Sequence, residues 1–239
     1  MKHSISLMIS ALLISGIASA EEAVPVSLWK ASAELGYVST SGNTNTESLN
    51  AKAMVSTDRE DWRHKGQITA MNSSEDDVKT AEKYSLTAQS DYKLEGKKNF
   101  LFGVIDYEND KFSGYEYRVS ESIGYGRRVI ENTDLILDLE IGPGARQSKL
   151  DNGTTESEGI IRGAAKLEWV VSKTSQFAEA LTVEAGDDAT ITKSVTSLSS
   201  KINGSLSMKI TYTYKNTSEV PVGIDDTDTE TAVTLVYNF

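Results

Sequence analysis

The residue best suited to acid–base chemistry is His64, which lies two positions after Trp62 in a segment where apolar and polar residues alternate. A hydrolase that used His64 as a general base would need a nucleophile and an orienting carboxylate beside it. No G-x-S-x-G motif accompanies this histidine. A hydrolase that uses His64 at the rim of the molecule is therefore the least favoured function.

Acidic residues gather in the stretch DDTDTE, residues 225–230. Carboxylate oxygens are the ligands that Ca²⁺ and Mg²⁺ prefer, but the stretch lacks the glycine and the spacing of an EF-hand loop. We expect a solvated acidic loop, with divalent cations bound at acidic outer loops as the alternative. No cofactor is expected.

Alternation with period two is the dominant pattern along the chain, and it predicts the elements that position these residues. It recurs in segments of about ten residues, the length that a tilted strand needs to cross a bilayer. The fifth segment is apolar on both faces, and the tenth is unusually polar. The predicted strands span residues 28–39, 47–57, 62–72, 82–94, 99–108, 115–129, 134–145, 159–171, 176–186, 192–202, 206–215 and 229–239.

The connections between these strands alternate in length. Residues 58–61 and 95–98 are short connections, whereas residues 72–81, 146–158 and 215–228 are long ones. This alternation is typical of outer-membrane barrels. The fold class predicted is all-β, an antiparallel transmembrane β-barrel of about 12 strands with short periplasmic turns and longer extracellular loops.

Charged side chains of both signs occupy the polar face of the predicted strands. In a barrel of about 12 strands they would either pair across the interior or line a thin aqueous path. An internally paired wall is favoured over a selective conduit. The candidate lumen charges are Arg118, Arg128, Arg146, Arg162, Lys166, Asp138, Glu140 and Glu168, while Glu121 and Glu179 fall on the nominal lipid face.

Aromatic residues gather at the ends of the predicted strands. Amphipathic rings collect at the two headgroup levels of a membrane barrel, whereas a soluble sandwich gives no reason for this placement. The predicted membrane girdles contain Trp29, Trp62, Trp169 and Tyr125 at the short-turn end and Tyr37, Tyr115, Tyr212 and Tyr214 at the long-loop end.

Composition limits the class of protein further. Residues 1–20 are predicted to be a cleaved signal peptide, and residues 21–239 one barrel domain. The formal net charge of −11 argues against nucleic-acid partners, and the absence of cysteine excludes thiolate sites. After the signal, no apolar run approaches the ~20 residues of a membrane-spanning helix.

Several strings resemble a known family, the YdiY-like salt-induced outer-membrane proteins, a bacterial family of unknown function. The strings are SGNTNTESL (41–49), EKYSL (82–86), DKFSGYEYR (110–118), GYGRR (124–128), EIGPGAR (140–146) and TAVTLVYNF (231–239). The resemblance implies a Gram-negative outer-membrane barrel linked to salt response. It supplies no catalytic or ligand residues.

The function expected from these patterns is a non-enzymatic outer-membrane β-barrel that contributes to salt or osmotic adaptation of the cell envelope. The alternative is a narrow, cation-preferring, porin-like channel, because the acidic loops would raise the local cation concentration. The expected partners are outer-membrane lipid, lipopolysaccharide and the barrel-assembly machinery, which would read Tyr237 and Phe239 as an assembly signal.

Deleting Phe239 is expected to lower the yield of assembled barrel, because a terminal aromatic residue resembles the assembly signal of bacterial barrels. The measurement compares unboiled and boiled outer-membrane samples on an SDS gel, where folded barrels migrate differently from unfolded ones. An unchanged heat-modifiable fraction would reduce Phe239 to a girdle residue.

Overall fold

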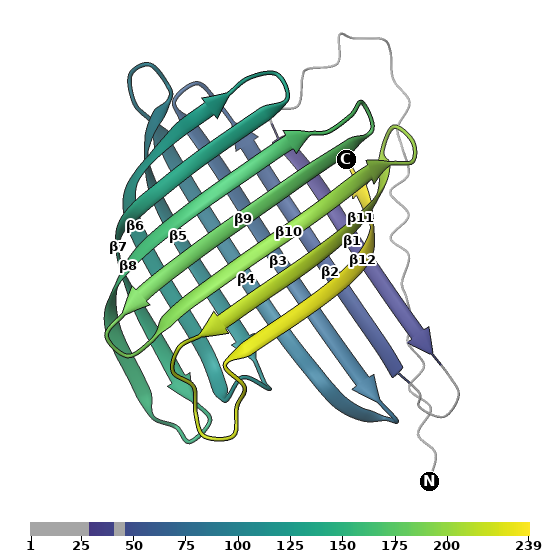
Figure 1. Cartoon of the computed structure of the whole chain (residues 1–239), viewed down its shortest axis with the longest axis vertical. Helices are drawn as coiled ribbons and strands as arrows, with labels where there is room; N and C mark the ends of the chain where they lie inside the picture. The colour runs from purple at the N-terminus through teal and green to yellow at the C-terminus, as the bar shows by residue number, and fades with distance from the viewer. Residues whose placement is uncertain (1–28, 41–45) are drawn as a thin grey trace, which may run out of the picture.

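Twelve antiparallel strands form one closed barrel in the computed structural model, which describes residues 29–40 and 46–239 (Figure 1). The predicted signal peptide, residues 1–20, lies outside the described residues. Each strand pairs with its neighbours in sequence, and β12 returns to β1. The strands are β1 (Trp29–Thr40), β2 (Thr46–Asp58), β3 (Trp62–Glu75), β4 (Val78–Lys93), β5 (Asn99–Asp110), β6 (Tyr115–Glu131), β7 (Leu135–Leu150), β8 (Thr155–Val170), β9 (Ser175–Gly186), β10 (Thr190–Lys201), β11 (Leu206–Thr217) and β12 (Thr227–Asn238).

The seam between β1 and β12 closes the barrel. Ala33 lies opposite Tyr237 there, and the backbone N–H of Phe239 donates to the carbonyl of Ala31 at 3.0 Å. A Cβ at Gly36 would lie 2.6 Å from the carbonyl oxygen of Val233, so only glycine allows this approach. We call the end where β1 starts and β12 finishes the terminal end, and the opposite end the loop end.

The two faces of the wall differ as the alternation predicts. Leu35, Ile68 and Ile141 are among many large apolar side chains exposed on the outside, while Glu34 and Arg162 are buried on the inside. A soluble domain places apolar side chains inside and polar ones outside, and here the distribution is reversed. It suits a wall that contacts lipid outside and water or paired charges inside. The predicted antiparallel barrel is confirmed. Within the part of the chain that the structure describes, no helix is long and apolar enough to cross a membrane.

At the loop end, the strands extend beyond their predicted ends. β3 and β4 continue to a two-residue turn at Asp76 and Asp77, whose φ angles of 47° and 65° suit a type I′ hairpin. Most of the segment 146–158, predicted as a loop, belongs to β7 and β8. Beyond the apolar band the residues are polar on both faces, so the alternation disappears although the hydrogen-bonded ladder continues.

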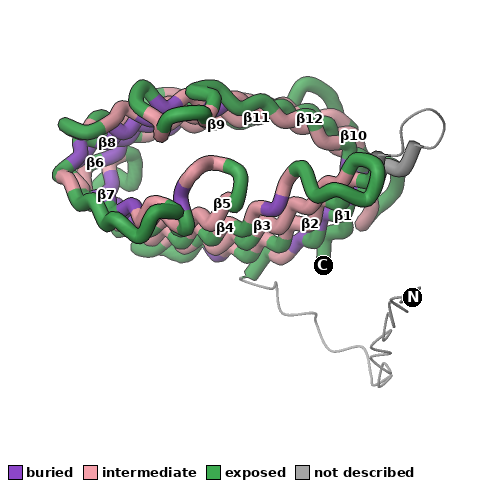
Figure 2. The backbone as a smooth tube through the Cα atoms, turned by 90° about the horizontal axis from the view of Figure 1, so that it is seen from below, coloured by how far each residue is buried: buried purple, intermediate pink, exposed green. Residues whose placement is uncertain are grey.

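The barrel is flattened in cross-section, with β6, β7 and β8 at one narrow end (Figure 2). Glycines allow the tight approach of strands here. A Cβ on Gly126 would lie 2.2 Å from the ring of Phe100, and one on Gly124 would lie 2.8 Å from the ring of Phe102. These rings explain why β5 is apolar on both faces: Phe100 and Phe102 point inward and cover the glycines of β6.

Replacing Gly142 with alanine is expected to lower the free energy of unfolding by about 1–3 kcal/mol, the usual range for overpacking. The new Cβ would lie 2.0 Å from the backbone carbonyl oxygen of Ile123, so a strand must move. Urea unfolding of the refolded barrel in lipid vesicles measures the effect. The control is Gly163→Ala, where no atom lies within 4 Å of the added Cβ; equal midpoints for the two variants would contradict this packing.

Candidate functional site

A cavity of about 210 Å³ lies inside the barrel, and we call it the chamber. Side chains from β3 to β6 line one wall and side chains from β8 to β11 line the other. The flattening brings these two walls close together, so that side chains reach across the lumen. Two such contacts delimit the chamber, one toward each end of the barrel, and we call them bridges.

The bridge toward the terminal end joins β4 to β7 and β8. The Gln89 amide nitrogen donates to Glu140 Oε1 at 2.9 Å, and Lys166 Nζ donates to the amide oxygen of Gln89 at 2.6 Å. Lys166 and Arg162 also pair with the two oxygens of Glu140, at 2.7 and 3.0 Å. Glu140 is the centre of this bridge, with a side chain only 1% exposed.

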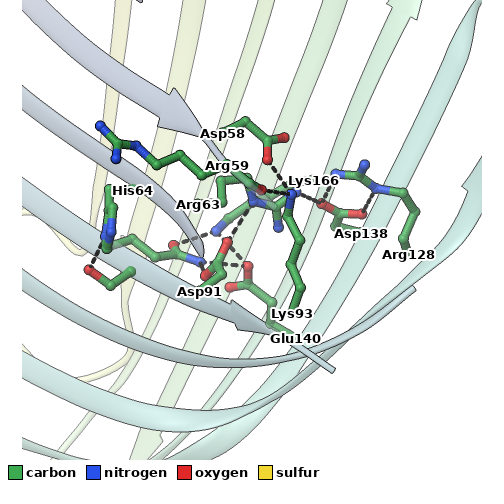
Figure 3. Close-up of polar contacts among 12 residues, drawn as sticks. Asp58, Arg59, Arg63, His64, Asp91, Lys93, Arg128, Asp138, Glu140 and Lys166 are labelled. Atoms are coloured by element: carbon green, nitrogen blue, oxygen red, sulfur yellow. Dashed lines mark hydrogen bonds and ion pairs between the residues drawn. The ribbon is translucent and has the colours of Figure 1, made fainter. Parts of the chain in front are cut away.

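A second group of charges continues this network toward the terminal end (Figure 3). Arg128 binds Asp138 through two nitrogens, at 2.8 and 3.0 Å. Arg63 joins Asp138 at 3.1 Å and Asp91 at 2.7 Å, and its guanidinium lies 4.9 Å from the ring centroid of Phe100. Gln89 donates to Asp91 at 2.8 Å and so connects this group to the bridge.

The bridge toward the loop end joins opposite walls directly. Lys215 on β11 forms an ion pair with Glu108 on β5, although these strands are not neighbours in the sheet. Lys83 on β4 also contacts Glu108, at 3.1 Å, and Asp110, at 3.4 Å. In a round barrel of twelve strands these two walls would lie too far apart for such a contact. The ion pair between Lys215 and Glu108 therefore marks a narrow point in the lumen.

The three remaining predicted lumen charges, Arg146, Arg118 and Glu168, lie in three different environments. Arg146 is almost fully buried and pairs with Glu158 at 2.5 Å and with Glu184 at 3.6 Å. Arg118 lines the chamber and lies 4.2 Å from the ring centroid of Tyr115. Glu168 is exposed near the terminal end, and no ion pair joins it to any described residue within 4 Å.

The girdle prediction is wrong for Tyr115. The residue is only 9% exposed, and its ring packs against the guanidinium of Arg118. A register shift between Tyr115 and Tyr117 changes the parity of the strand, which period-two counting could not foresee. Of the other predicted girdle residues, Trp29, Trp62, Trp169, Tyr125, Tyr37 and Tyr212 are exposed and Tyr214 is half-buried.

His64 lies outside the chamber, on the outer face of β3. Its ring stacks on Trp62, with centroids 5.6 Å apart, and its Nδ1 lies 2.8 Å from Ser90 Oγ. Among the described residues, no carboxylate forms a hydrogen bond with this imidazole. Ser90 also lies within β4, whose two edges are paired with β3 and β5, so ladder hydrogen bonds occupy the N–H donors that an oxyanion hole would need.

The two carboxylates predicted on the lipid face are in different environments. Glu179 is half-buried and accepts hydrogen bonds from Ser194 at 2.6 Å and Thr196 at 2.5 Å, both on the polar outer face of β10. Glu121 is exposed.

In residues 29–40 and 46–239, no group of three or more histidine, aspartate or glutamate side chains is placed to hold a metal ion.

Sequence reasoning missed several chamber residues. Gln89, Glu108, Lys193 and Lys215 line the chamber but were absent from the predicted set. All four have the inward parity of their strands, so alternation could have found them. The high polarity of β10 concealed Lys193, since serine and threonine occupy both faces of that strand.

A family model described as a protein of unknown function, DUF481, matches residues 33–239, which is nearly all of the barrel. The chain belongs to the DUF481 family. The uncharacterized protein YdiY of Escherichia coli (strain K12) is 28% identical over 211 residues, covering 85% of this chain and 80% of that protein. The resemblance to YdiY-like proteins of unknown function is confirmed.

Two solved structures share the barrel fold of this DUF481 protein. The NanC porin has a TM-score of 0.53 at 12% identity and is similar over 87% of this chain and 98% of its own. An outer-membrane channel from Pseudomonas putida F1 has a TM-score of 0.52 at 12% identity, over 94% and 100% of the two chains. At this identity the likeness concerns the fold alone.

Replacing Glu140 with glutamine is expected to lower the free energy of unfolding by about 3–5 kcal/mol, because it leaves the buried Arg162 and the half-buried Lys166 without their charge partner. Urea unfolding measures the loss. The control is Glu60→Gln, whose pair with Lys97 at 3.2 Å is exposed on both sides and should contribute at most about 1 kcal/mol. A loss no larger than that of the control would show that Glu140 does not organise the lumen.

Proposed function

We propose that this DUF481 protein is an outer-membrane barrel that acts as a narrow passive channel for small polar solutes. The observation that carries the proposal is the chamber, a cavity of about 210 Å³ that lies between the two cross-lumen bridges and is lined in part by charged and hydroxyl side chains. A purely structural barrel has no need of an internal cavity lined by charged and hydroxyl side chains. The bridges would keep the pathway narrow, because each brings side chains of opposite walls into contact.

The membrane location is supported by the outer surface. Large apolar side chains cover the outer face, with Trp62 and Trp169 toward the terminal end and Tyr37 and Tyr212 toward the loop end. This arrangement matches an apolar band with aromatic rings at both interfaces. In this orientation the terminal end faces the periplasm and the loop end faces outward.

The arrangement of His64, Ser90 and the lumen charges supports a transport role better than a catalytic one. The pair formed by His64 and Ser90 resembles a base and a nucleophile, but no carboxylate among the described residues orients the imidazole. The lumen charges that form ion pairs are held by one another, and these pairs need no catalytic reaction to explain them. A role in salt adaptation is supported by the family resemblance. Its test compares the growth of a deletion strain and its parent at raised NaCl. Equal growth of the two strains would contradict this role.

Purified, folded protein is expected to give discrete conductance steps in planar bilayers. Lys215→Ala should increase the size of these steps, because it removes the side chain that crosses the lumen to Glu108. Lys149→Ala is the control, since Lys149 pairs with the exposed Glu116 at 2.5 Å, away from the bridge. A silent bilayer with heat-modifiable protein would overturn the channel, and equal steps for all three proteins would remove the bridge as its narrow point.

A further inference from the structure

The chamber carries an excess of positive charge, although the whole chain is acidic. Six basic side chains and three carboxylates line it, which gives a net formal charge of +3. Glu140, which pairs with two of the basic residues from just outside the lining, reduces the local excess to +2. The lining residues that carry these charges are Lys65, Arg118, Arg162, Lys166, Lys193 and Lys215, with Asp106, Glu108 and Glu184.

Three of these cations lack an ion pair with any described residue within 4 Å. Lys65 lies on β3, Arg118 on β6 and Lys193 on β10, so they face the cavity from different parts of the wall. Arg118 contacts the Tyr115 ring and the Ser148 hydroxyl, neither of which carries a formal charge, and its cross-strand neighbour Glu108 is bound by Lys215 and Lys83. The other three lining cations are held by Glu140 or Glu108.

The positive region continues beyond the chamber toward β2 and β11. Lys52 on β2 lies close enough to Lys65, Lys193 and Lys209 to interact with them electrostatically. Three carboxylates act on this group. Glu34 faces Lys52 but is already bound by Lys209 at 3.0 Å. Glu168 acts on Lys65, and Glu108, which Lys215 and Lys83 already bind, acts on Lys193, both from beyond 4 Å. Like charges gathered in a partly desolvated space are unfavourable without a counter-charge, so the arrangement favours an anion among them.

From these charges we infer that the chamber binds small anions, of the carboxylate or phosphate class, and makes the proposed channel prefer anions over cations. This inference rests on the proposed channel function. Rings of lysine and arginine select anions in pores, because their positive charge attracts anions and repels cations. The acidic outer loops predicted a preference for cations. In the stretch 225–230, which lies at the loop end, Asp225, Asp226 and Asp228 are exposed and Glu230 is half-buried.

The chamber outweighs the acidic rim for a physical reason. Exposed rim charges are screened within about 8 Å at physiological ionic strength. Charges between the low-dielectric walls of a narrow lumen are screened much less, and an ion must pass them at contact distance. Selectivity is therefore set by Lys65, Arg118 and Lys193 rather than by the loops.

The test is the reversal potential of the full barrel in planar bilayers with a KCl gradient. Wild-type protein should be more permeable to chloride than to potassium, and the double variant Lys65→Gln, Lys193→Gln should lose most of this preference. The matched control, Lys97→Gln with Lys149→Gln, also removes two positive charges, but from exposed pairs. Heat-modifiable migration verifies folding of each protein.

The outcomes separate the two proposals. Conductance steps with a preference for potassium, or an equal loss of preference in the control, would overturn the anion site and leave the channel standing. If folded protein shows no conductance in bilayers, the channel proposal is contradicted. The anion site is then tested by calorimetric titration of detergent-solubilised protein with inorganic phosphate at low salt. Binding that weakens in the Lys65, Lys193 variant supports it, whereas no binding, or equal binding by both proteins, overturns it.

Discussion

Closure of the hydrogen-bonded ladder is the constraint on which the rest of the structure depends. In a lipid environment an unpaired backbone N–H or C=O costs several kcal/mol, so a sheet is tolerated only when it has no free edge. The seam between β1 and β12 meets this requirement, and Gly36 permits it because a Cβ there would press on the Val233 carbonyl. Once the ladder is closed, alternation assigns most side chains to lipid or to lumen, with exceptions where the register shifts, as at Tyr115.

The shape of the closed barrel then decides what the lumen charges can do. Glycines on β6 and β7 allow a tight corner, where the rings of Phe100 and Phe102 fill the space that side chains would otherwise occupy. The corner flattens the barrel and brings β5 within reach of β11. The same charges in a round barrel would pair only with neighbours on adjacent strands, whereas here Lys215 reaches Glu108 on the opposite wall.

Pairing inside the lumen is therefore uneven. On the side of the corner, basic side chains and carboxylates form ion pairs in contiguous networks around Asp138 and Glu140. On the opposite side, Lys52, Lys65 and Lys193 form no ion pair within 4 Å with a described residue. A single barrel thus combines an ion-paired half with a half whose lysines lack ion pairs, and that division is the physical basis for the proposed anion preference.

The sequence by itself determined the barrel, its twelve strands and the face of most residues, because a period of two is a local property that each strand shows without its neighbours. It also identified Arg128, Asp138, Arg162 and Glu140 as inward charges. It failed at Tyr115, where a register shift changes the parity, and beyond the apolar band, where the ladder continues without alternation. Only the tertiary structure decided which charges meet, because the contacts from Gln89 to Glu140 and from Lys215 to Glu108 depend on how far the closed sheet is flattened.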